Sequence, residues 1–476
     1  MMAQHEETMG KKIYEFMIDK VVMIIFILFV IFGFIFTEVA AGNFANEMLA
    51  RFFRNALLVL SLIIPVMAGL GLNFGIVIGS MAGMLALIFV RYHYTIFIGF
   101  PGLLAAFAIA TPIAILFGYL TGKLYNKTKG QEMVASLIVG FFADALYLVF
   151  VLWMIGGLIP VAAGHRIMNP GDPTIGVAHT LDLGLPAGEI TARHGDMLPG
   201  VARALNNLWQ IEFVYALVVV AVFMFVYVVI RRFVEKKNPA MAQTPNWLFI
   251  TQLVICVAIT IFAIYSAIGI YYWYNVLAEA RLENARMGLH QLEGISPFFV
   301  EMSNINQVPV VTALVIAFTG AFMLYFTRTK LGQDCRAVGQ SQQIANVSGI
   351  DVDRTRVIAT IISTVIASWG MIIFIQDMGH MSVYTAHRFI GFFSIAAILV
   401  GGATAARANV KNAFAGLLLF HAMMVLSPEV GRFISGDGNV GEYLRSLMVY
   451  GSIGLSLGLY VWKTNRAARE KERLRD

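Results

Sequence analysis

The chain alternates between long apolar segments and short polar links. A membrane-spanning helix needs about 20 predominantly apolar residues, and twelve segments approach or reach that length. They are 20–37, 56–72, 74–90, 102–122, 134–158, 211–230, 247–273, 308–326, 355–375, 389–404, 410–426 and 443–462. Because several of them are short, we predict an all-α fold, a polytopic transmembrane helix bundle of about 10 spans (10–12 apolar segments). The bundle is expected to form a single domain over residues 1–476.

Two of the apolar regions, 56–90 and 389–426, are interrupted by glycines and leave little room for an ordinary loop. Irregular backbone at membrane depth is stable only where protein buries it or where it lines a cavity. Matching interruptions in the two halves of a chain are typical of a central transport pathway. We therefore predict broken or re-entrant half-helices beside such a pathway.

Composition supports a membrane protein and indicates its orientation. Hydrophobic residues make up 59% and charged residues 13% of the chain, against about 45–50% and about 25% in soluble domains. If the N-terminus is cytoplasmic, about two thirds of the 34 Lys and Arg residues fall in cytoplasmic segments, as the positive-inside rule requires. This orientation places both termini in the cytoplasm. It makes 160–210 an extracytoplasmic loop insert, 331–354 a cytoplasmic loop and 463–476 a charged cytoplasmic tail.

The loop at 331–354 is a polar island between two apolar segments. Gly339 can start a turn, and 340–348 is long enough for about two helical turns. Gly349 then stands where helices commonly end in a left-handed residue. The apolar positions of this short helix are Ile344, Ala345 and Val347. The pattern predicts a capped helix that presents a surface to a partner on the cytoplasmic side.

The order of small, charged and apolar residues in this loop resembles a known family, the permease subunits of ABC importers for simple sugars, nucleosides and branched-chain amino acids. The matching residues are Leu331, Gly332, Arg336, Ala337, Val338, Gly339, Ala345, Gly349, Ile350, Val352 and Arg354. Weaker similarity is found at 130–137 and 388–402. In that family the loop is the coupling helix, which docks in a groove of a cytoplasmic ATPase.

The resemblance implies several properties of the chain. The residues expected to couple to the ATPase are Arg336, Ala337, Gly339, Ile344, Ala345, Gly349 and Ile350. The expected partners are a cytoplasmic ABC ATPase that binds ATP and Mg, a second permease copy or paralogue, an extracytoplasmic solute-binding protein and the lipid bilayer. The expected location is the plasma membrane, the inner membrane of a bacterium. The basic residues lie in short loops rather than on one face, so no nucleic-acid partner is expected.

No residue pattern is typical of a catalytic or metal site. Segment 118–124 is similar to a phosphate-binding loop, but its spacing is one residue short and a leucine follows Lys123. The nine histidines and two cysteines show no metal-ligand spacing. We therefore predict a transport subunit rather than an enzyme, with no metal and no cofactor bound by this chain.

Polar groups inside apolar segments are candidates for the substrate path, because an ionisable group costs about 2.5–3.5 kcal/mol there on insertion scales. The candidates are Asn73, Glu132, Asp144, Trp369, Gln376 and His421. The alternative for each of them is an ordinary hydrogen bond between helices.

The sequence thus predicts the membrane-spanning permease subunit of an ATP-driven ABC importer. It would form the path for a simple sugar or nucleoside and couple to the ATPase through 331–354. One alternative is an ion-coupled secondary transporter, which shares broken helices but usually needs several carboxylates in the membrane. Another is an ABC permease for branched-chain amino acids. A membrane enzyme would need clustered Asp, His or Ser, and the sequence shows no such cluster.

Overall fold

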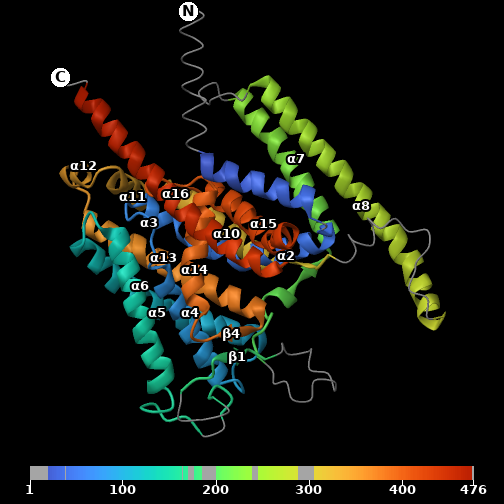
Figure 1. Cartoon of the computed structure of the whole chain (residues 1–476), viewed down its shortest axis with the longest axis horizontal. Helices are drawn as coiled ribbons and strands as arrows, with labels where there is room; N and C mark the ends of the chain where they lie inside the picture. Colours follow the sequence, from blue (N-terminus) through green and yellow to red (C-terminus); the bar gives the residue numbers. More distant parts are fainter. Residues whose placement is uncertain are drawn as a thin grey trace, which may run out of the picture. The chain divides into compact units, whose positions relative to one another are not determined.

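The architecture was derived from a computed structural model. It describes residues 20–37, 39–162, 165–169, 176–184, 200–237, 245–287 and 305–473. Parts of the predicted loop insert and the last three residues of the predicted tail lie outside the described residues. The described chain is predominantly helical (Figure 1), which confirms the all-α prediction. It divides into two compact units.

The first unit lies within Met1–Val39, Ala50–Leu208 and Val311–Asp476. An apolar helix over Lys20–Phe36 opens it. Its further helices are the second half of α2 (Ala41–Ser61), α3 (Ile63–Met67), α4 (Ile76–Tyr92), α5 (Gly99–Lys127), α6 (Glu132–Val149), the π-helix η1 (Phe150–Met154), the 3-10 helix η3 (Asn206–Leu208), α10 (Val310–Phe326), α11 (Lys330–Gln340), α12 (Gln342–Val347), α13 (Val352–Met378), α14 (Ala386–Val400), α15 (Val410–Ser435) and α16 (Gly438–Arg473). Strands β1 (Thr180–Asp182) and β4 (His380–Ser382) pair antiparallel, with Leu181 opposite Met381.

The second unit comprises Ala40–Leu49 and Trp209–Val310. Two long helices, α7 (Phe213–Lys237) and α8 (Asn246–Met287), pack against each other in it. Strands β2 (Gln210–Ile211) and β3 (Val308–Pro309) pair antiparallel. Most apolar side chains in the spanning parts of both helices are exposed, as expected for helices that face lipid.

The number of spans is lower than the sequence predicted. Within the described residues, seven helices are long and apolar enough to cross a membrane, or eight if α10 and α11, bent by 70°, count as one broken span. Three predicted spans form helices of only 10–17 residues, namely Lys20–Phe36, α4 and α14. Helices α4 and α14 bury most of their residues against other helices. They therefore need not match the thickness of the bilayer, because protein rather than lipid surrounds them.

Helix α13 forms the centre of the first unit and packs closely on α4 and α5. Glycines on these neighbours permit the close approach. A Cβ atom on Gly79 of α4 would come within 2.6 Å of the Thr364 carbonyl oxygen, and one on Gly118 of α5 would come within 2.8 Å of the Ile361 Cα. The Thr364 hydroxyl also donates to the Ala114 carbonyl at 3.0 Å. Small residues and hydroxyl hydrogen bonds are the usual means of holding membrane helices together.

The predicted helix breaks are present in the structure. Between α3 and α4 the chain passes through Gly69 and Gly71, both with φ near +70° (73° and 69°), a conformation that only glycine adopts without steric cost. Between α14 and α15 the chain is likewise non-helical, and Gly402 has a φ of 85°. The first of these breaks leads directly to the cavity described below.

Candidate functional site

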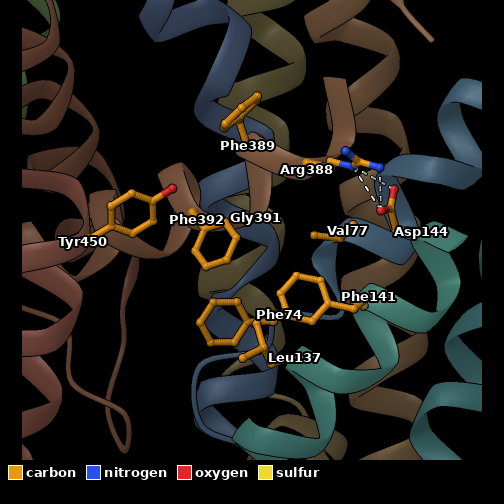
Figure 2. Close-up of a pocket in the computed structure, with 11 residues that line it drawn as sticks. Phe74, Val77, Leu137, Phe141, Asp144, Arg388, Phe389, Gly391, Phe392 and Tyr450 are labelled. Carbon is orange, nitrogen blue, oxygen red and sulfur yellow. Dashed lines mark hydrogen bonds and ion pairs between the residues drawn. The ribbon is translucent and has the colours of Figure 1, made fainter. Parts of the chain in front are cut away.

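A cavity of about 380 Å³ lies within the first unit (Figure 2). Its walls are Phe74 just before α4, Val77 in the first turn of α4, α6 from Leu137 to Asp144, α14 from Arg388 to Phe392, and Tyr450 of α16. Four separate elements therefore converge on it, and the broken segment before α4 supplies one of them. This is the position expected for a binding site beside irregular backbone in a helix bundle.

Aromatic rings form a large part of the cavity wall. Phe392 lies between Phe74 and Tyr450, with ring centroids 5.6 Å and 5.9 Å away and both pairs edge to face. Phe141 and Phe389 add two further rings (Figure 2). Phe389 and Phe392 share a face of α14 because residues three apart on a helix are neighbours. The cavity therefore offers flat apolar surfaces to a ligand.

One end of the cavity is polar. Arg388 places Nη2 2.9 Å from Asp144 Oδ2, and its Nε donates to both carboxylate oxygens at 3.1 Å and 3.0 Å (Figure 2). Behind this pair, His387 Nε2 donates to Asp144 Oδ1 at 2.5 Å. The side chain of Asp144 is 17% exposed and that of Arg388 is 44% exposed. A ligand in the cavity can therefore reach a hydrogen-bond acceptor and a donor fork at this end.

His387 is fully buried and holds the carboxylate in place. Its ring packs edge-on against Tyr147, with centroids 4.9 Å apart, and the Tyr147 hydroxyl donates to the Val383 carbonyl at 3.0 Å. Because an ionised carboxylate only accepts hydrogen bonds, the bonded His387 nitrogen carries the proton. Among the described residues no group of three or more His, Cys, Asp and Glu side chains could hold a metal ion.

The polar loop between α10 and α13 forms two helices, α11 and α12, rather than one. Ser341 caps α12 by accepting from Ile344 N at 3.3 Å, and Gly349 follows with a φ of 81°. The helix is shorter than the predicted 340–348, but the glycine at its end has the predicted left-handed conformation. Ser341 separates the two helices because a serine that caps a helix takes an extended backbone conformation.

The loop has its own small core. The buried residues Val338, Ala345 and Val352 pack together, and Ala337 and Ile350 lie against them. On the opposite side, Ile344 is 69% exposed and Val347 is 90% exposed. Helix α12 therefore presents two large apolar side chains to the outside of the chain while its alanine holds it to α11 and α13.

Gly339 joins this loop to the first helix break. A Cβ atom on Gly339 would lie 2.1 Å from the Met67 carbonyl oxygen, and one on Gly69 would lie 2.8 Å from the Gly339 Cα. The two backbones therefore touch, and any larger residue would separate them.

A sequence profile of the family described as "branched-chain amino acid transport system / permease component" matches residues 201–436, about half of the chain. The matched region contains the α11–α12 loop and the α14 wall of the cavity. The chain belongs to this permease family. It is a multi-pass membrane protein and a transport subunit of an ABC system.

The permease is also similar to a curated relative, the nucleoside ABC transporter permease protein NupB of Lactococcus lactis subsp. cremoris (strain MG1363). The two are 29% identical over 102 residues, which is 21% of this chain and 26% of the relative. The match thus spans about a quarter of the relative's length. No solved structure matches the chain significantly.

Of the six predicted path residues, only Asp144 lies among the described residues that line the cavity. Asn73 is buried behind the wall, where its Oδ1 accepts from the Tyr125 hydroxyl at 2.8 Å and from Gly75 N at 2.9 Å. Glu132 is buried and paired with Arg356 at 2.5 Å. Neither side chain lines the cavity, and each makes buried polar contacts with other parts of the permease.

The other three predicted residues make contacts elsewhere in the bundle. Trp369 donates from its indole nitrogen to the Thr111 hydroxyl at 3.0 Å. Gln376 donates to Asn206 Oδ1 at 3.0 Å. His421 is buried, with its ring 5.3 Å from that of Phe420. Each of these contacts joins helices or fills the core of the permease.

Of the predicted coupling residues, Arg336 and Ile344 are exposed, whereas Ala345 is buried in the loop core. Ala337 and Ile350 pack against that core. Gly339 permits the close contact with the segment between α3 and α4, and Gly349 adopts the left-handed backbone conformation. The predicted set therefore contains both outward-facing and structural positions, which the spacing in the sequence did not separate.

Sequence reasoning missed Arg388, Phe392, Phe74 and Tyr450 as cavity residues. A signal was available for the first two. Arg388 lies at the start of an apolar segment and Phe392 follows it by four residues, which places both on one helix face. Phe74 and Tyr450 are ordinary aromatic residues of apolar segments, and only the packing of α16 beside α14 brings them together.

Proposed function

We propose that the permease forms the translocation path of an ABC importer for nucleosides, and that it couples to a separate cytoplasmic ATPase through residues 331–354. The proposed substrate class rests on the cavity, which has five aromatic rings and its charged side chains, Asp144 and Arg388, at one end. Family membership favours ATP-driven import over the ion-coupled alternative. Affinity for the solute can also reside in an extracytoplasmic binding protein.

The cavity suits a nucleoside better than a simple sugar. A base has two flat apolar faces that stack on aromatic rings, and each such contact contributes about 1–3 kcal/mol in nucleic-acid-binding proteins. A monosaccharide carries a hydroxyl on nearly every carbon, and each hydroxyl buried without a partner costs about 1–3 kcal/mol. Asp144, Arg388 and the Tyr450 hydroxyl are too few to satisfy a hexose, but they can bind the ribose or the edge of a base.

A second candidate substrate is a branched-chain amino acid. The description of the family names this class, and the Asp144–Arg388 pair could exchange its partners for the ammonium and carboxylate of a zwitterion. This exchange would break the pair that the structure contains, at 2.9 Å. A nucleoside can bind beside the intact pair, so we place it first.

The proposed docking surface of the ATPase is the exposed side of α12, defined by Ile344 and Val347. Two large apolar side chains at 69% and 90% exposure are typical of a surface that a partner covers. With cytoplasmic termini, as the positive-inside rule indicates, this surface faces the cytoplasm. ATP and Mg would bind on the partner, and a second permease copy or paralogue would complete the membrane part.

Co-purification from detergent tests the coupling proposal. We expect an ABC ATPase to co-purify with the wild-type permease and to be lost from the Ile344→Asp/Val347→Asp variant. Gln343→Asp/Asn346→Asp is the matched control, because it adds the same two charges to exposed polar positions of the same helix. Ala345→Asp is unsuitable, because it would bury a charge in the loop core. Absence of an ATPase from the wild type, or equal retention by the double variant, would refute the proposal.

A further inference from the structure

Arg356 is a buried cation that takes no part in the cavity. It lies in the second turn of α13, just after the loop that carries α12. Its side chain is 0% exposed. A guanidinium in this position has lost all of its hydration, so its partners in the protein must replace water.

Three elements meet at this guanidinium. Arg356 Nη2 donates to Glu132 Oε1 at the start of α6, at 2.5 Å, and to the Tyr125 carbonyl near the end of α5, at 3.2 Å. Nη1 donates to Gln342 Oε1 of α12 at 3.5 Å, the longest of the three contacts. The first turn of α12 is thus bonded to the side chain that also holds the α5–α6 corner.

The same corner is bonded to the cavity wall. The Tyr125 hydroxyl donates to Asn73 Oδ1 at 2.8 Å, and that oxygen also accepts from Gly75 N at 2.9 Å. Between them, Phe74 N donates to the Ser136 hydroxyl of α6 at 3.2 Å. Phe74 is one of the rings of the cavity. A continuous path of polar contacts therefore leads from α12 to a wall of the cavity.

The path is incompletely satisfied at two points. Arg356 Nε and Asn73 Nδ2 are buried, and neither has a hydrogen-bond partner among the described residues. An unsatisfied buried donor is costly, and native proteins contain few of them. Two of them in one network leave donors available to a second arrangement of the same side chains.

We infer that Arg356 is a positioning residue that couples movement of α12 to the cavity wall at Phe74, through Tyr125 and Asn73. The inference rests on the proposed function for its purpose, since α12 is the proposed ATPase contact and the cavity the proposed solute site. The coupling itself is a property of this chain and can be measured without any partner. It acts beside the backbone contact between Gly339 and Gly69, which carries no side-chain hydrogen bond.

The test is the labelling rate of a cavity cysteine in the purified chain in lipid nanodiscs. Val77→Cys lines the cavity next to Phe74. The native Cys256 and Cys335 are buried, and burial raises the pKa of the Cys335 thiol to about 12, so it stays protonated. A water-soluble maleimide should therefore report the introduced cysteine.

Two substitutions interrupt the path at separate places. Gln342→Ala removes the contact at α12, and Tyr125→Phe removes only the hydroxyl that binds Asn73. We expect each to raise the labelling rate at Val77→Cys by about threefold or more, within the range of measured couplings. Because both lie on one path, the double variant should label no faster than the faster single variant.

The matched controls are Tyr119→Phe, which removes an exposed hydroxyl from the same helix α5, and Asn346→Ala, which shortens an exposed amide on the same helix α12. Both should leave the rate unchanged. Unchanged rates in the two path variants, fully additive effects, or a lowered unfolding temperature with an unchanged rate would overturn the inference. Failure of an ATPase to co-purify would refute the proposed function alone, because the labelling experiment needs no ATPase.

Discussion

The permease carries two acid–arginine pairs on helix α6, and their surroundings differ. Asp144 pairs with Arg388 at the edge of the cavity, and the arginine side chain is 44% exposed. Glu132 pairs with Arg356, which is 0% exposed. The two acids lie about 18 Å apart along α6 at 1.5 Å per residue. The first pair can be reached by a solute, whereas the second is sealed between helices.

The comparison shows that two ionised groups on one membrane helix can have very different surroundings. Judged by insertion cost alone, Glu132 and Asp144 are equally good candidates for the substrate path. What separates them is the partner and the exposure that the fold gives each one. The Glu132 pair joins α5, α6, α12 and α13, so its replacement should affect stability. Replacement of the Asp144 pair should instead affect transport.

The largest expected effect is on stability, from breaking the buried pair. Arg356→Met leaves Glu132 without its cation, and loss of one partner of a buried pair costs about 3–5 kcal/mol. Thermal unfolding in detergent should show a markedly lower midpoint. The double variant Glu132→Met/Arg356→Met should recover part of the loss, because no uncompensated charge remains.

The matched control for this prediction is Arg354→Met, which removes the same charge from an exposed position of the same helix. Its change should stay within about 0.5 kcal/mol, as for most surface substitutions. An equal unfolding midpoint for Arg354→Met and Arg356→Met would show that the buried pair contributes no more to stability than an exposed charge.

The second effect is on transport, from the exposed pair. Asp144→Asn keeps the shape of the side chain but removes its charge, and a hydrogen bond to a charged group contributes about 1.5–3 kcal/mol. Uridine uptake by proteoliposomes that contain the purified transporter should fall about tenfold or more, with little change in the unfolding midpoint. Glu429→Gln is the control, since this acid pairs with Arg432 away from the cavity. Loss of folding without a specific loss of uptake would indicate that the Asp144–Arg388 pair has a structural role instead.

The third effect separates the substrate classes. Phe392→Leu removes the central ring of the cavity, and the loss of one stacking contact should raise the half-saturating uridine concentration about fivefold or more. The concentrations of ribose or leucine that compete with uptake should change less, because neither molecule contains a base that can stack on the ring. The control is Phe318→Leu, an exposed ring on α10. A larger effect on leucine than on uridine would favour the amino-acid alternative.

The smallest expected effect comes from a single hydroxyl. Tyr450→Phe keeps the ring that contacts Phe392 but removes one polar group of the cavity. A neutral hydrogen bond contributes about 0.5–1.5 kcal/mol, so uridine affinity should fall about two- to tenfold. Tyr443→Phe, on the same helix and 74% exposed, should have no effect. Equal behaviour of the two variants would place the Tyr450 hydroxyl outside the site.

Much of the local structure could be predicted from the sequence. The apolar segments form helices, the glycines at 69 and 71 break one of them, and Gly349 follows α12 in the left-handed conformation. These features depend on residues close together in the chain, where hydrophobicity and backbone sterics act directly. The predicted span count was too high because an apolar helix buried in protein has the same composition as one that crosses lipid.

The composition of the site could be predicted only in part. Asp144 is identifiable as a charge in an apolar segment, but its partner Arg388 lies 244 positions away. The same reasoning selected Glu132, whose partner Arg356 is 224 positions away and buries it. Ile344 and Ala345 are adjacent and similarly apolar, yet one is exposed and the other buried, because neighbouring residues on a helix point in different directions.

The sequence by itself determined that this protein is a helical membrane protein with a capped loop helix, since length, apolar content and local glycine positions suffice for that, and the resemblance of the loop to a permease family supplied the function. The tertiary structure alone decided which charges meet, which aromatic rings enclose the cavity and which side of α12 is free. Those properties arise from contacts between helices that are distant in sequence. No local pattern encodes them, because burial and pairing are set by the neighbours that the fold supplies.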